Sequence, residues 1–307
     1  MENSNIEVIG IDHGWANIKT ISQIFTSAVD EITTEPALFD NILEYEGKYY
    51  SIGGKRLEVK NTKVEDNNYY LLTLAAIAKE LDRRGMKSSN VLLAVGLPLT
   101  RFGAEKQDFI DYLSRKKQVT FRFGKKTYNI TIFRVSVFPQ CYAAVTDQIS
   151  EYVRKRVVVD IGSWTIDIMP IEEKMPDESR CHTVNEGLIT CMRSIKDECT
   201  RQLNGTIEES EIKYVMMTGK SDIDAKYFAI MEDEIKKFAT SVYHKLIEYG
   251  YNLETTSITF VGGGATVMKL FGGLKKKNIE YIEDVKANAK GYERLAKMFL
   301  NSRRKEG

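Results

Sequence analysis

The chain has 307 residues, of which 43% are hydrophobic and 28% charged, and a formal net charge of +1; this is typical of a globular protein of about two domains. The balanced charge excludes a uniformly basic surface, so no direct DNA binding is expected. No apolar run reaches the ~18 residues of a membrane span, and residues 1–5 lack the features of a signal peptide. We therefore expect a cytoplasmic protein with no membrane partner.

The first predicted element is an apolar strand that ends in an Asp-x-Gly turn. Residues 6–11 are mostly aliphatic, Asp12 and Gly14 form the turn, and a return strand contains Asn17 and Lys19. A carboxylate at a strand end, followed by a glycine whose backbone can approach an anion closely, can hold a metal-bound phosphate.

The next elements alternate between strands and helices. A segment of alternating residues spans 22–32, and a polar, tyrosine-rich stretch over 41–70 is expected to be a small, surface-exposed insertion. Apolar residues at helical spacing predict a helix over 71–81. Further patterns predict a strand over 91–96, a helix over 104–115, a hairpin over 119–137, and a helix over 142–152 that Pro139 and Gln140 open.

The turn motif then occurs a second time. Val157 to Val159 are apolar, Asp160 and Gly162 form the turn, and a return strand follows Thr165. One Asp-x-Gly triplet is expected by chance roughly once in a chain of this length, but here both copies have a strand on each side. Two ordinary tight hairpins are the alternative interpretation.

The second half continues in the same style. The expected elements are a helix from Asn185, as its cap, to Leu203; a long helix over 223–249; a strand over 257–261; the triplet Gly262, Gly263 and Gly264; a short helix over 265–270; and a last helix over 287–299. This order predicts two α/β domains related by duplication, with both turns facing a cleft between them.

We predict a first domain over 1–153, with a small outer insertion at about 36–70. The second domain is predicted over 154–307, with an outer subdomain at about 186–255. The helix at 287–299 is expected to pack back on the first domain.

These residues offer the groups that a magnesium-bound nucleotide needs. Asp12 and Asp160 would be the metal-side carboxylates, acting through water because Mg²⁺ sheds its hydration shell reluctantly. The glycine triplet would lie flat against a nucleoside at a helix N-terminus. Lys19 could reach a phosphate as a point charge, with a solvated lysine as the alternative. The turn amides would come from Gly14, Trp15, Gly162, Ser163 and Thr165.

In this order, the three glycine elements resemble those of the actin-like ATPase superfamily, and most of all the ParM-like plasmid-segregation actins. The segment Asp12 to Lys19 is similar to the family's first phosphate loop, residues 160–167 to the second, and residues 260–264 to the adenosine motif. The resemblance implies an α/β, actin-like (ribonuclease H-like) fold of duplicated domains that flank an interdomain nucleotide cleft.

The resemblance also implies an ATPase that uses ATP, with GTP as an alternative, together with Mg²⁺. Asp12, Asp160 and Gln140 would be catalytic, Gln140 by orienting the attacking water; a capping or solvated glutamine is the alternative. Lys196 would flank the adenosine. Trp15 departs from the family, where many members have a serine that can touch the terminal phosphate. The implied nucleotide-binding residues are Gly14, Trp15, Asn17, Lys19, Gly162, Ser163, Trp164, Thr165, Lys196, Gly262, Gly263 and Gly264.

For function, the resemblance implies a protein that polymerises with itself when ATP is bound and moves plasmid DNA through a small DNA-binding adaptor on a plasmid centromere. A cell-shape or organelle-positioning filament is one alternative. A small-molecule kinase is another, and it would use an Asp as general base. An Hsp70 chaperone would need a further domain after residue 300.

Overall fold

The computed structural model describes residues 6–152 and 155–306, and it divides into two compact units. Unit 1 comprises Met1–Asp147 with Asn288–Gly307, and unit 2 comprises Gln148–Ala287. The predicted boundary at 153/154 lies outside the described residues, as does the N-terminal pentapeptide behind the localisation prediction. By this division the last helix is part of unit 1.

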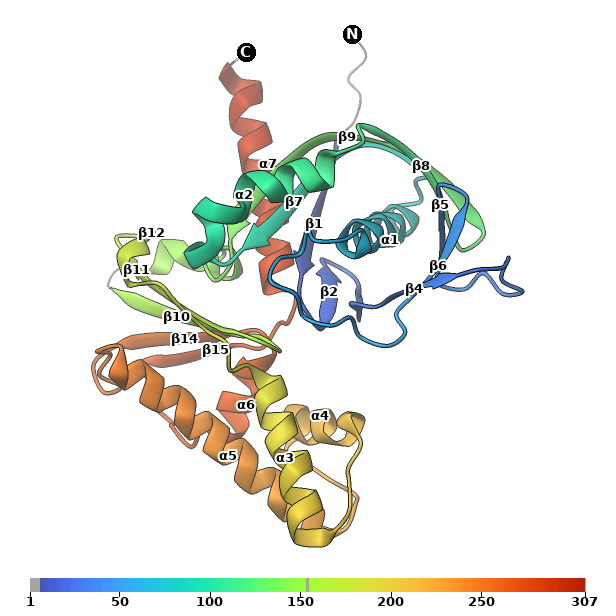
Figure 1. The fold of residues 1–307 in the computed structure, drawn as a ribbon. Coiled ribbons are helices and arrows are strands. Elements are labelled where there is room, and N and C mark those ends of the chain that lie inside the picture. The colour runs from blue at the N-terminus through green and yellow to red at the C-terminus, as the bar shows by residue number, and fades with distance from the viewer. Residues whose placement is uncertain (1–5, 153–154, 307) are drawn as a thin grey trace. The chain divides into compact units, whose positions relative to one another are not determined.

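Unit 1 is built on a nine-stranded sheet within the described residues (Figure 1). Its strands are β1 (Ile6–His13), β2 (Asn17–Thr20), β3 (Ile24–Thr26), β4 (Val29–Ile32), β5 (Ile42–Tyr45), β6 (Lys48–Ile52), β7 (Ser88–Leu97), β8 (Gln118–Phe123) and β9 (Lys126–Pro139). Across the sheet they lie in the order β3-β2-β1-β7-β9-β8-β5-β6-β4. Because β1, β7 and β9 are parallel neighbours, their carboxyl ends share one edge.

Side chains of β1 alternate between the two faces of this sheet, and each face is covered by different helices. Ile9 and Ile11 pack in one core with α1 (Asn68–Arg83) and with α2 (Leu99–Ser114). Val8 packs in another core with Tyr292 of α7 (Ala287–Glu306). In Figure 1, α1 lies inside the curve of the sheet and α7 runs along β1 on the other face. Since successive side chains of a strand point to opposite faces, β1 is buried on both.

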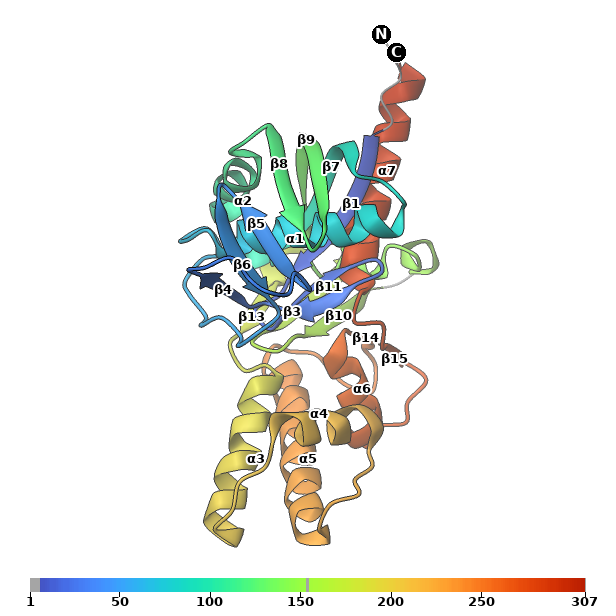
Figure 2. The ribbon, with the colours of Figure 1, turned by 90° about the vertical axis from the view of Figure 1, so that its right-hand side faces the viewer.

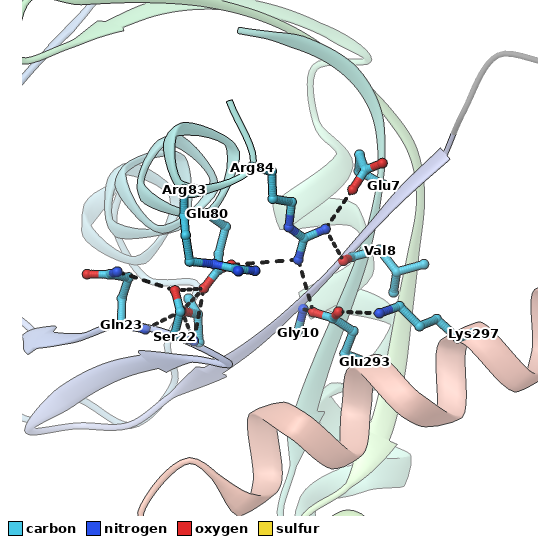
Figure 3. Close-up of polar contacts among 11 residues, drawn as sticks. Glu7, Val8, Gly10, Ser22, Gln23, Glu80, Arg83, Arg84, Glu293 and Lys297 are labelled. Atoms are coloured by element: carbon cyan, nitrogen blue, oxygen red, sulfur yellow. Dashed lines mark hydrogen bonds and ion pairs between the residues drawn. The ribbon is translucent and has the colours of Figure 1, made fainter. Parts of the chain in front are cut away.

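A buried charge network joins α7 to β1 and α1 (Figure 3). The Glu293 carboxylate accepts the Gly10 backbone N–H at 3.2 Å and pairs with Arg84 at 3.3 Å. Arg84 also pairs with Glu7 at 2.8 Å and donates to the Val8 carbonyl at 2.9 Å. Arg84, which directly follows α1, therefore connects that end of the helix to β1 and to Glu293 of α7.

Unit 2 is built on a second sheet of mixed direction, covered by helices (Figure 2). The strands are β10 (Arg156–Ile161), β11 (Ile166–Glu172), β12 (Met175–Pro176), β13 (His182–Val184), β14 (Ser257–Val261) and β15 (Ile279–Ile282); the helices are α3 (Leu188–Leu203), α4 (Glu209–Thr218), α5 (Ala225–Glu248) and α6 (Gly263–Phe271). The inward side chains Val157, Val159 and Ile161 pack with these helices in one core. β10 and β14 are parallel neighbours, so their carboxyl ends also meet.

The prediction of a helix over 142–152 is wrong. That segment contains only two short 3-10 turns, Ala143–Val145 and Ile149–Glu151. Cys141 has φ +61°, in the left-handed region, immediately after Gln140. A left-handed residue cannot continue a right-handed helix, so the chain changes direction at Cys141.

Other predictions need smaller corrections. Gly187 rather than Asn185 is the N-cap of α3. The helix after the glycine triplet begins at Gly263, two residues earlier than expected. The stretch over 41–70 is not simply a surface insertion, because β5 and β6 join the main sheet and Leu43 is fully buried. Helix α4 and strand β15 were not predicted. Among the described residues, no helix combines the length and apolar character that a membrane span requires.

Candidate functional site

The first Asp-x-Gly turn joins β1 to β2 as predicted. Asp12 and Lys19 are cross-strand partners, and their side chains form an ion pair at 3.0 Å. The Asp12 carboxylate is almost fully buried. Lys19 is therefore not a solvated lysine in this structure; it neutralises the carboxylate that was predicted to face the metal.

Gly14 is required at this turn by a close approach. A Cβ at Gly14 would lie 2.6 Å from the Asn17 carbonyl oxygen, well inside van der Waals contact. The Gly14 carbonyl accepts hydrogen bonds from the Ser27 hydroxyl at 2.7 Å and from the Tyr69 hydroxyl at 3.4 Å. Ser27 and Tyr69, which lie outside the hairpin, therefore stabilise the turn in addition to the pairing of β1 with β2.

His13 points into the core instead of toward the turn. Its Nε2 lies 2.8 Å from the Thr73 hydroxyl, and its ring packs edge-on against Phe109. Burial, with a smaller contribution from the charge of Lys63, lowers the pKa of His13 to about 3, while the charge of Asp12 opposes the shift. The imidazole is neutral near pH 7 and is part of the turn's support.

Gln140 lies at the same sheet edge as the first turn. It directly follows β9, its backbone N–H donates to the Leu97 carbonyl at 3.0 Å, and its side chain is half-buried. Neighbouring strands lie about 4.8 Å apart, and β7 alone separates β9 from β1. Gln140 and Asp12 therefore lie at the same edge of the sheet, with one strand between theirs.

The second turn is tied to the start of α3. Its carbonyls at Gly162, Ser163 and Trp164 accept the backbone N–H groups of Leu188 (3.1 Å), Ile189 (2.9 Å) and Gly187 (3.0 Å). These bonds satisfy amides that a helix otherwise leaves unpaired, which explains why the cap lies at Gly187. The amides at the start of α3 are thereby occupied by the turn.

The side chains of the second turn are fixed by partners within unit 2. The Thr165 hydroxyl donates to Asp167 at 3.1 Å, and the Thr183 hydroxyl donates to the same carboxylate at 2.6 Å. Arg193 of α3 lies over the Trp164 ring at 5.1 Å. Asp167 and Thr183 were not among the predicted site residues, although Asp167 is part of the matched motif.

Asp160 and the glycine triplet lie together. Asp160 is in register with Val261, the residue before the triplet. Gly262 has φ +78°, and a Cβ there would lie 2.9 Å from Asp160 Oδ1. Only glycine adopts this conformation without strain. The second turn and the glycine triplet therefore lie together around the Asp160 carboxylate.

Three further predicted site residues are Asn17, Ser163 and Lys196. Asn17 pairs with Thr26 on β3, and Ser163 is half-buried in its turn. Lys196 lies eight residues after the start of α3, which puts it about 12 Å along the helix from the second turn. Within unit 2, Lys196 is therefore not part of the second turn.

These groups fit a magnesium-bound nucleotide. Asp160 offers a half-buried carboxylate at a strand end, which suits a hard cation that keeps its waters, and Gly262 leaves a space that a Cβ would fill. Asp12 is almost fully buried and paired with Lys19. The described residues contain no group of three or more His, Cys, Asp or Glu side chains that could bind a metal by themselves. A metal at this site would therefore depend on water and on the phosphates of the nucleotide.

Comparisons with known proteins agree with the fold. Residues 10–142 match the family model described as the actin-like proteins N-terminal domain. No match was found among curated protein sequences.

Solved structures resemble nearly the whole chain. A ParM from a 15-stranded Clostridium botulinum filament is 20% identical, with a TM-score of 0.77 over 96% of this chain and 99% of that one. Bacillus thuringiensis ParM with ATP is 14% identical, with a TM-score of 0.73 over 97% and 99%. The archaeal actin homologue Ta0583 in complex with ADP is 19% identical, with a TM-score of 0.71 over 95% and 99%. The predicted resemblance is thus confirmed: the chain has the actin-like fold of the ParM proteins, and residues 10–142 match the N-terminal domain of the actin-like protein family.

Proposed function

We propose that this chain binds ATP with Mg²⁺, assembles into filaments in the ATP state and hydrolyses the nucleotide. The observation that carries this proposal is the Asp160 carboxylate held against Gly262 at the end of two parallel strands. The first turn repeats the same design with Asp12 and Gly14. Two such turns have the chemistry of a phosphate clamp.

In this proposal Asp12 and Asp160 hold the hydrated cation, and the backbone amides of Gly14, Trp15, Ser163 and Thr165 donate to phosphate oxygens. The Gly162 amide is not among them, because it donates to the Thr165 carbonyl at 2.9 Å. The bound Mg²⁺ supplies charge neutralisation for the phosphates. Lys19, which is paired with Asp12 at 3.0 Å, adds a positive charge beside the first turn. Gln140 would accept a hydrogen bond from the attacking water and orient it. Gly263 would let backbone lie against the nucleoside. Gly264 is instead buried against Ile161, whose side chain a Cβ at Gly264 would meet.

We further propose that the filaments move plasmid DNA through a separate DNA-binding adaptor. The likeness to ParM supports this proposal at the level of fold, and the net charge of +1 supports a need for an adaptor. A filament for cell shape or organelle positioning would share the ATP-dependent assembly but not the adaptor.

Light scattering with ATP and Mg²⁺, followed by electron microscopy, tests assembly. Scattering should rise with ATP at micromolar protein and fall as phosphate is released, and filaments should be visible at the plateau. Scattering that stays flat would contradict the filament proposal. ADP formation that depends on an added sugar, without release of inorganic phosphate, would instead indicate a kinase.

A further inference from the structure

The peptide group between Gly14 and Trp15 has its direction fixed by two hydroxyls. The Ser27 hydroxyl donates to the Gly14 carbonyl at 2.7 Å, and the Tyr69 hydroxyl donates to the same oxygen at a longer 3.4 Å. A peptide group is planar and trans, so its C=O and its N–H point in opposite directions. The N–H of Trp15 belongs to this group, and it therefore points away from Ser27 and Tyr69.

Ser27 is itself held in place by its backbone. The residue is fully buried in the connection between β3 and β4. Its N–H donates to the Ala16 carbonyl at 3.0 Å, and its carbonyl accepts the Leu57 N–H at 2.9 Å. Because neither bond uses the side chain, loss of the Ser27 hydroxyl would leave both in place and would release the Gly14 carbonyl.

The Trp15 N–H is available to a ligand. Within residues 6–152 and 155–306, no group accepts a hydrogen bond from it. The Trp15 ring packs edge-on against the Tyr69 ring, with 5.6 Å between ring centres, so the residue on the N–H side of this peptide group is anchored as well. A backbone N–H that is already oriented binds an anion without the cost of turning toward it.

We propose that Ser27 is a positioning residue that directs the Trp15 amide at the nucleotide's phosphate chain, with Tyr69 as a second, weaker donor. Neither side chain touches the nucleotide; both act through the Gly14 carbonyl. Without the Ser27 hydroxyl the peptide group can rotate, and a carbonyl oxygen turned toward phosphate oxygens is repelled by them. This inference rests on the proposed function, since it requires the phosphates to bind at the first turn.

A purely structural role is the alternative: the two hydroxyls would only stabilise the β1–β2 hairpin. The two roles differ once ATP is bound. Loss of a structural contact would lower the stability of the hairpin but leave the Trp15 amide bonded to phosphate at saturating ATP. Loss of a positioning contact would remove that bond even at saturation.

Hydrogen exchange of the Trp15 amide in the full chain, with and without saturating ATP and Mg²⁺, tests the inference. The variants are Ser27→Ala and Tyr69→Phe. Ser114→Ala is the matched control, because the Ser114 hydroxyl also donates to a backbone carbonyl, that of Ile110 at 2.6 Å, within α2. Titration of ATP into each protein gives the affinities.

We expect ATP to slow exchange of the Trp15 amide at least about tenfold in the wild type and in Ser114→Ala. In Ser27→Ala the amide should exchange within about twofold of its nucleotide-free rate, even at saturating ATP. ATP should bind Ser27→Ala about tenfold more weakly, the size of one charge-assisted hydrogen bond. Tyr69→Phe should lose part of the protection and about threefold in affinity.

Each other outcome overturns a specific claim. Wild-type protection of the Trp15 amide in ATP-saturated Ser27→Ala would overturn the positioning role, whatever the variant's stability. If Ser27→Ala does not fold, Tyr69→Phe decides, and full protection there would overturn the inference. A wild-type chain that binds ATP without slower exchange at Trp15 would also overturn it, while leaving the proposed function intact. A wild-type chain that does not bind ATP would overturn the proposed function itself.

Discussion

Gly262 lies directly against the carboxylate of Asp160, where an added Cβ would be 2.9 Å from Oδ1. Gly262 also has φ +78°, a conformation that side-chain-bearing residues adopt only with strain. One glycine therefore meets two separate requirements: a left-handed backbone and space for a functional carboxylate.

Gly262→Ala should lose nucleotide binding by at least about tenfold, because the new methyl group displaces Asp160. It should also cost about 1–2 kcal/mol of stability through backbone strain. Gly273→Ala is the matched control, since Gly273 has φ +71° but no atom within 4 Å of the position that an added Cβ would take. The control should show the stability cost alone, and titration of ATP into both variants checks this. Equal ATP affinities would contradict the contact.

Glu293→Ala should destabilise unit 1 by about 1–3 kcal/mol, because it leaves the Gly10 N–H without its acceptor and removes one of the carboxylates that pair with Arg84. Hydrogen exchange at the Gly10 amide should accelerate together with the loss of stability in urea. Lys297→Ala is the control: Lys297 also pairs with Glu293, at 2.6 Å, but its side chain is 56% exposed, so its removal should cost no more than about 0.5 kcal/mol. Similar losses in both variants would mean that the pairing with Arg84 carries little stability.

The stability of the protein should fall as the pH drops from 6.5 toward 5, in part because of His13. Burial, helped by Lys63, lowers the folded-state pKa of His13 to about 3, against 6.5 when unfolded. The unfolded chain therefore takes up a proton in this range and the folded chain does not, so the stability contribution is present above pH 6.5 and lost below it. The loss should reach about 2 kcal/mol by pH 5. Urea unfolding of His13→Gln should show a flatter pH dependence, and an equally steep dependence would contradict the buried neutral imidazole.

Gln140→Ala should slow ATP hydrolysis by about 100-fold, because it removes the group proposed to orient the water. ATP affinity should stay within about threefold of the wild type, since no phosphate contact is assigned to Gln140. Single-turnover phosphate release with titration of ATP separates the two effects. A variant with normal turnover would remove Gln140 from the mechanism.

The sequence was sufficient to predict both Asp-x-Gly hairpins and the glycine triplet. These features are local: a strand, a turn and a strand are encoded by neighbouring residues, as in Ile6 to Lys19. The parallel pairing of β10 with β14, which brings Asp160 to Gly262, was not predicted, because it joins strands about a hundred residues apart in sequence.

The features that sequence reasoning missed depend on tertiary contacts. The left-handed Cys141 precedes a segment, 142–152, whose apolar spacing suits a helix but which contains only two short 3-10 turns, and nothing in that spacing reveals them. The cap of α3 moved to Gly187 because carbonyls of the second turn, more than twenty residues earlier in sequence, satisfy the first amides of the helix. Lys63 reaches Trp15 across 48 positions of sequence, 63 minus 15, and only the fold places them together.

The most direct test of the account is phosphate release from ATP and Mg²⁺ by the wild-type chain and by Asp160→Ala. We expect steady release from the wild type and a rate at least about 100-fold lower in the variant, which loses a carboxylate proposed to hold the cation. Circular dichroism should show that the variant is folded. Equal rates for the two proteins, or no release by the wild type, would contradict the claim that this pair of turns forms an ATPase site.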